Sequence, residues 1–84
     1  MLLGIVNKPQ FDANVFVIGC AMEMYSKEDD CFYDVLITNN AGTSITVMYY
    51  SSGSRKVECK QIIIDEVLLK DYSFKKLEVQ AYDK

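Results

Sequence analysis

The sequence predicts a mainly β fold, a small antiparallel barrel or sheet of about five or six strands, OB-like or SH3-like in strand count. Three observations predict it. Apolar residues alternate with a period of two along residues 14–25. Two further strand-like runs flank the polar break Asn39–Thr43, as in a hairpin. Short polar turns separate the runs, and closing so few strands into a barrel would remove the unpaired sheet edges.

The first part of the chain predicts two strands. The apolar run Met1–Val6 is typical of an edge or first strand, and it ends before Pro9. Residues 14–25 predict the longest strand. Its alternate apolar positions are Phe16, Ile18, Cys20, Met22 and Met24. Gly19, in the middle of this strand, indicates a bulge or a tight bend.

The middle of the chain, CFYDVLITNNAGTSITVMYYSS (31–52), predicts a hairpin. A three-residue loop with Gly42 at positive φ would pair Asn39 with Thr43, and the Asn39 side chain would bond to the turn. The expected cross-strand pairs are then Ile37–Ile45, Val35–Val47 and Tyr33–Tyr49. They make one face continuously apolar. The opposite face carries Phe32, Asp34, Leu36, Met48 and Tyr50.

The last third of the chain predicts two more strands. Residues 57–64 favour a strand because Ile62–Ile64 are β-branched, and a single helical turn can follow near Asp65. The alternative is an α+β domain in which residues 57–70 form a helix on an antiparallel sheet. Residues 73–82 alternate and predict a final strand. Its inward positions would be Leu77, Val79 and Ala81.

Length, charge and cysteines restrict the class of protein. The 84 residues predict one domain, 1–84, that buries only about 60–65% of its unfolded surface. The net charge of −3 argues against a nonspecific nucleic-acid binder. Three dispersed cysteines predict free, reduced and buried thiols. The opening MLLGIV is too short for a signal peptide, and no apolar run approaches the ~20 residues of a membrane span. We therefore expect a cytoplasmic protein without membrane contact.

No pattern in the sequence predicts catalysis. The chain has no histidine, which removes Ser-His-Asp systems and most zinc sites, so we expect no enzyme, no cofactor and no metal. The acidic patch Glu28, Asp29 and Asp30 lacks the spacing of a calcium loop and is typical of a solvated turn. The loop and strand residues Arg55, Lys56 and Lys60 are candidates for contact with phosphate or nucleic acid.

The remaining hypothesis is a non-enzymatic binding module, of the size typical of inhibitors and of accessory proteins of phages or mobile elements. Its candidate partner-binding residues are Phe32, Asp34, Leu36, Met48 and Tyr50. This face could instead be core, but Asp34 would then be a buried, unpaired carboxylate, which costs several kcal/mol. The partner would be another protein or a second copy in a homodimer. The alternative is an OB-like single-stranded nucleic-acid-binding protein that stacks bases on Phe32 and Tyr50.

Overall fold

The computed structural model describes residues 9–51, 53 and 55–77. Within them the chain forms five strands and one short helix: β1 (Ala21–Ser26), β2 (Cys31–Asn40), β3 (Ser44–Ser51), β4 (Lys56–Ile63), α1 (Ile64–Leu68) and β5 (Tyr72–Lys76). All strands belong to one antiparallel sheet in the order β4-β3-β2-β1-β5. The predicted mainly β class is confirmed. The predicted run Met1–Val6 lies outside the described residues.

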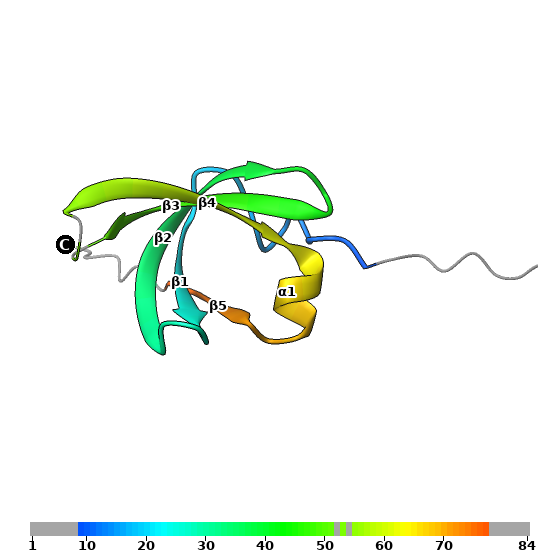
Figure 1. Cartoon of the computed structure of the whole chain (residues 1–84). Coiled ribbons are helices and arrows are strands. Elements are labelled where there is room, and N and C mark those ends of the chain that lie inside the picture. The colour runs from blue at the N-terminus through cyan, green and yellow to red at the C-terminus, as the bar shows by residue number, and fades with distance from the viewer. Residues whose placement is uncertain (1–8, 52, 54, 78–84) are drawn as a thin grey trace, which may run out of the picture.

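The sheet curls over its core (Figure 1). β4 and β5 lie at its two margins, and α1 spans the space between them. No ladder joins β4 to β5 within the described residues, so the hydrogen bonding forms an open sheet there rather than a closed barrel. The inner face carries the core: Phe11, Met22, Met24, Val35, Ile37, Ile45, Val47, Ile62, Ile64 and Tyr72. The single described helix is too short to cross a membrane.

The segment before β1 differs from the prediction. The strand expected over 14–25 begins only at Ala21, and residues 12–20 form successive turns. The Asp12 carboxylate accepts a hydrogen bond from the Asn14 N–H at 2.8 Å, and the Asp12 carbonyl accepts from Val15 and Phe16. An Asp side chain competes with a strand ladder in this way. The bend expected at Gly19 is confirmed: its φ is +93°, and its N–H donates to the Ile37 carbonyl as the chain enters the sheet.

The expected hairpin register is wrong by two residues. Ile37 pairs with Val47 and Val35 with Tyr49, instead of with Ile45 and Val47. The turn begins one residue later than expected because Asn40, and not Asn39, accepts the Gly42 N–H through its side chain at 2.9 Å. A bulge at Thr38 absorbs the extra residue. A two-residue slip leaves each side chain on its face, so the expected apolar face is still the core face.

Gly42 adopts a φ of +90°, as the sequence predicted. We expect Gly42→Val to lower the free energy of unfolding by about 1 kcal/mol or more, because a β-branched residue resists this region of φ. No atom lies within 4 Å of a Cβ built at Gly42, so backbone strain alone would cause the loss. Urea denaturation measures it. Ala41→Val, at an exposed neighbour without positive φ, should change stability by less than about 0.5 kcal/mol. Equal losses in the two variants would contradict the strain argument.

The strand expected near 57–64 is confirmed as β4, and the alternative helix over 57–70 is not formed. The helix is limited to α1, where the Glu66 carboxylate accepts the Ile63 N–H at 3.0 Å. The last strand starts at Tyr72, and its inward residues are Tyr72 and Phe74. The inward residues of β5 are therefore even-numbered, whereas the expected inward residues were odd-numbered. The reason is that the Tyr72 and Phe74 rings fill the core beside β1. Leu77 is half-buried beyond the strand, while Val79 and Ala81 lie outside the described residues.

Candidate functional site

The outer face of the sheet, which points away from the core, carries the predicted partner-binding residues. Leu36 of β2 pairs with Met48 of β3, and Tyr50 of β3 pairs with Val57 of β4. The side chains of Phe32 and Tyr50 are 66% and 59% exposed, and Val57 is 62% exposed. We call the set Phe32, Asp34, Leu36, Met48, Tyr50 and Val57 the outer patch.

Two adjoining shallow hollows lie on the outer patch. One, of about 370 Å³, is lined by Phe32, Asp34 and Tyr50 together with Cys31 and Tyr33. The other, of about 290 Å³, includes Leu36, Met48 and Val57 in its lining. Asp34 and Tyr50 line both. The structure therefore brings the five predicted residues together around two connected depressions.

Asp34 is exposed, as its charge required. Among the described residues, no basic side chain forms an ion pair with it. Its carboxylate thus stands in water among apolar side chains, where it can orient an approaching partner by charge.

Val57 is the outer-patch residue that sequence reasoning missed. It follows Tyr50 after the SSGSRK turn and belongs to a different strand. The signal was available, because a hairpin closed at that turn places Val57 opposite Tyr50. The ambiguity between strand and helix over 57–70 concealed it.

The three residues of the acidic patch in the β1–β2 turn have two roles. The Tyr33 hydroxyl donates to the Asp29 carboxylate at 2.8 Å, and the Tyr25 hydroxyl donates to Asp30 at 2.5 Å. These bonds raise the pKa of Tyr33 to about 12 and also raise the pKa of Tyr25, because each carboxylate stabilises the protonated phenol. Glu28 points elsewhere and lines a pocket described below. Asp29 and Asp30 therefore serve to hold the turn.

The three predicted basic residues do not form one anion site. Arg55, with a φ of +58°, and Lys56 are exposed at the β3–β4 turn. Lys60 lies further along β4, where its ammonium stands 5.4 Å from the centre of the Tyr72 ring. A hydrogen bond with the Tyr72 hydroxyl raises the pKa of Lys60. Lys60 is thus committed to a contact on the inner side of the sheet.

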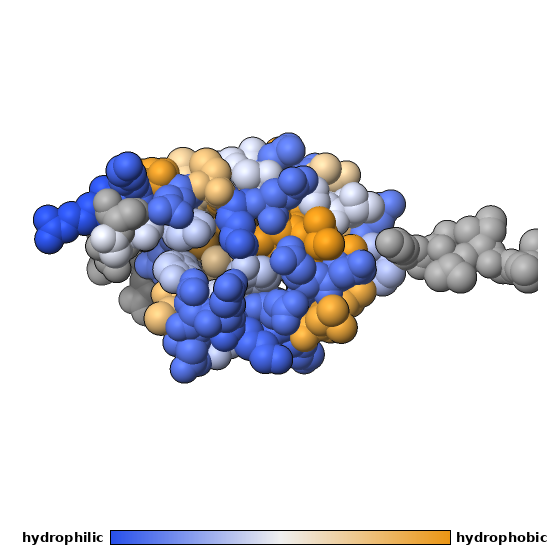
Figure 2. All heavy atoms as spheres, viewed as in Figure 1, coloured by the Kyte–Doolittle hydropathy of each residue, from blue (hydrophilic) through white to orange (hydrophobic). Residues whose placement is uncertain are grey.

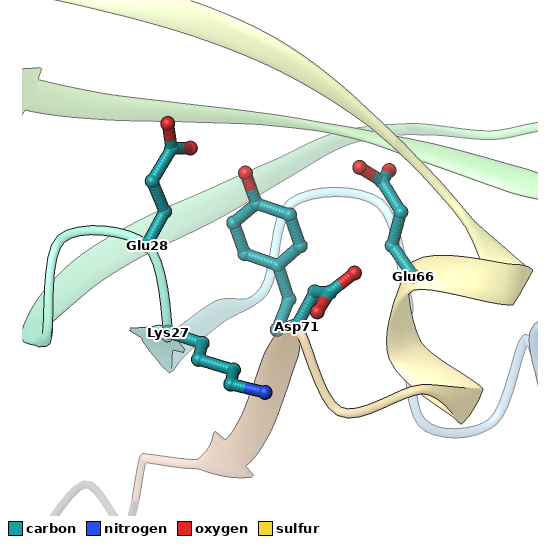
Figure 3. Close-up of a pocket in the computed structure, with 5 residues that line it drawn as sticks. Lys27, Glu28, Glu66 and Asp71 are labelled. Carbon is teal, nitrogen blue, oxygen red and sulfur yellow. The ribbon is translucent and has the colours of Figure 1, made fainter.

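A polar pocket of about 410 Å³ opens between the β1–β2 turn, α1 and β5. Figure 3 shows Glu28 and Glu66 on opposite sides of it, with Lys27 and Asp71 below. Several of these residues already serve the fold. Glu66 caps α1, and the Asp71 carbonyl accepts the Lys27 N–H at 2.9 Å. No group of three or more metal-ligating side chains is placed to hold a metal ion in the described part of the chain.

All three cysteines are free, as predicted, but the expectation that they are buried is wrong. Each is exposed: Cys20 precedes β1, Cys31 begins β2, and Cys59 points outward from β4. Their small apolar character did not place them in the core, because Cys20 lies in the turn segment before β1, Cys59 lies on the outer face, and Cys31 is the first residue of β2, at the end of the strand.

A second group of exposed apolar residues surrounds α1. Leu68 and Leu69 are 55% and 71% exposed, and Ile63 is 47% exposed. Figure 2 shows hydrophobic residues gathered on this side, while hydrophilic residues cover much of the remaining surface in view. None of these three residues lines either hollow of the outer patch.

No family model matches the chain, and neither a curated protein nor a solved structure proved similar to it. The geometry of the outer patch is therefore the feature of this molecule that points to a function.

Proposed function

We propose that this chain is a non-enzymatic binding module that docks a protein partner on the outer patch. The observation that supports the proposal is the exposure of Phe32 and Tyr50 beside Asp34. Aromatic side chains are enriched at the centres of protein interfaces, where a few of them supply most of the binding free energy.

The rigidity of the outer patch also favours binding. Leu36, Met48 and Val57 lie on neighbouring strands of one ladder, so their relative positions are set by main-chain hydrogen bonds. The Phe32 ring packs on the Tyr25 ring with 5.0 Å between the ring centroids, and this contact restricts the rotamers of Phe32. Less conformational entropy is lost when such a pre-ordered surface binds.

Affinity capture with the wild-type chain, followed by titration of the captured protein in purified form, tests the proposal. Phe32→Ala and Tyr50→Ala should each weaken binding at least fivefold, which corresponds to about 1 kcal/mol. Both variants should remain folded, because neither side chain belongs to the core. Circular dichroism melts check the fold.

Leu69→Ala is the matched control, because Leu69 is equally exposed but lies on the α1 side of the molecule. It should bind as the wild type does. The proposal fails if Leu69→Ala abolishes binding while the two aromatic variants bind normally. It also fails if the aromatic variants unfold and leave association otherwise unchanged, since the outer patch would then be part of the core.

A further inference from the structure

Two carboxylates stand side by side on the outer face of the sheet. Glu23 of β1 is directly opposite Asp34 of β2 in the antiparallel ladder. Both side chains point outward, because the neighbouring residues Met22, Met24 and Val35 are buried in the core. Opposite residues on one face have Cβ atoms about 4.5–5.5 Å apart, and like charges at that distance destabilise a sheet. A pairing that costs stability in the free chain is typical of a functional position.

The other neighbours of Asp34 do not supply a compensating charge. Ala21 and Tyr25, which lie diagonally across β1, are uncharged. Lys75 of β5 is opposite Glu23, on the side away from Asp34, and the two line a separate hollow of about 270 Å³. Among the described residues neither carboxylate forms an ion pair. Asp34 therefore faces one negative charge and, within the described ladder, no positive charge.

The apolar surroundings of Asp34 restrict which cation can neutralise it. Two hollows meet at Asp34 and Tyr50, and they are lined on one side by Phe32 and on the other by Leu36. A cation that binds here displaces water from apolar and aromatic side chains. A guanidinium group suits this place, because it is planar, stacks on aromatic rings and offers five N–H donors to carboxylates, whereas an ammonium is strongly hydrated. Arginine is also enriched at protein interfaces, where lysine is depleted.

We propose that the protein partner of the outer patch inserts an arginine side chain between Glu23 and Asp34, with apolar side chains of the same segment in the two hollows. This inference rests on the proposed function, because it names the partner's chemistry at the same patch. Phe32 and Leu36 are four residues apart on β2, a distance of about 13 Å in an extended strand. In an extended partner segment, the residues two positions before and two positions after the arginine have the same spacing and point to the same side.

The pentapeptide acetyl-Leu-Ala-Arg-Ala-Leu-amide is the probe that tests the proposal. In an NMR titration of the isotopically labelled full-length chain, it should shift the amide resonances of Asp34, Leu36 and Tyr50 in proportion to occupancy. The resonances of α1 should not move. The same peptide with citrulline, which has nearly the shape of arginine but no charge, should bind at least about fivefold more weakly, and so should the peptide with lysine.

Carboxylate variants test the two residues that hold the arginine. Asp34→Asn and Glu23→Gln should each weaken binding of the arginine peptide at least about fivefold. Asp34→Asn should also raise the urea midpoint of the free chain, because it removes the repulsion between the opposite carboxylates. A purely structural role of Asp34 would not combine weaker binding with higher stability. Glu28→Gln is the matched control, because Glu28 is exposed in the β1–β2 turn outside the outer patch, and this variant should bind as the wild type does.

The proposal is overturned if the wild type does not bind the arginine peptide, or if the citrulline or lysine peptide binds as tightly. It is also overturned if Asp34→Asn and Glu23→Gln leave binding unchanged, or if the shifted resonances lie in α1. Failure of the proposed function is a different result. If Phe32→Ala and Tyr50→Ala weaken binding of the captured protein while the carboxylate variants do not, the outer patch docks a protein without an arginine, and only the present inference fails.

Discussion

Ile37→Ala should lower the free energy of unfolding by about 2–5 kcal/mol. The Ile37 side chain is 0% exposed on the central part of β2, opposite Val47, and its main chain bonds to Gly19 and Cys20. Removal of its methyl groups leaves a cavity that the surrounding strands cannot fill, because their ladders hold them in place. A chain of this length has a total stability of only about 4–13 kcal/mol, so the variant loses a large part of it.

Urea denaturation with linear extrapolation measures the loss from Ile37→Ala. Ile18→Ala is the control, because it removes the same atoms from a side chain that is 58% exposed in the turn segment. Its effect should stay within about 0.5 kcal/mol. If the two variants were equally destabilised, the assignment of the inner face as the core would be wrong.

Asn40→Ala should cost about 2 kcal/mol, roughly 1 kcal/mol for each of two hydrogen bonds. The Asn40 Nδ2 donates to the Phe16 carbonyl at 2.9 Å, while its Oδ1 accepts the Gly42 N–H at 2.9 Å. One side chain therefore joins the turn segment 12–20 to the β2–β3 hairpin. The same urea experiment measures the loss, and amide hydrogen exchange in residues 12–20 should become faster.

Asn39→Ala is the matched control for Asn40→Ala. Asn39 is exposed, and its substitution should change stability by less than about 0.5 kcal/mol. Asn40→Asp keeps the acceptor toward Gly42 but loses the donor toward Phe16, so it should fall between the two. If Asn39→Ala were more destabilising than Asn40→Ala, Asn39 would be the residue that bonds to the turn, as the sequence predicted.

The sequence predicted five of the six outer-patch residues, all except Val57, but it did not predict how they pair. Alternation with a period of two assigns each residue of β2 and β3 to a face, and a slip of two residues preserves that assignment. Leu36 and Met48 were therefore expected on the outer face, although not opposite one another. Asp34 also indicated which face meets water, because burial of an unpaired carboxylate is costly.

The sequence by itself determined the strand-rich class, the two faces of the hairpin, the bend at Gly19 and the positive φ at Gly42. These features depend on neighbours along the chain. Only the tertiary structure decided the register, because Asn39 and Asn40 suit the turn equally well by local chemistry. The choice falls to Asn40, which alone bonds to the Phe16 carbonyl, 24 residues away in sequence. The first residues of the alternating run 14–25 do not join the strand for a related reason. Phe16 packs against Phe74 from the far end of the chain, and such a contact leaves no mark on local periodicity.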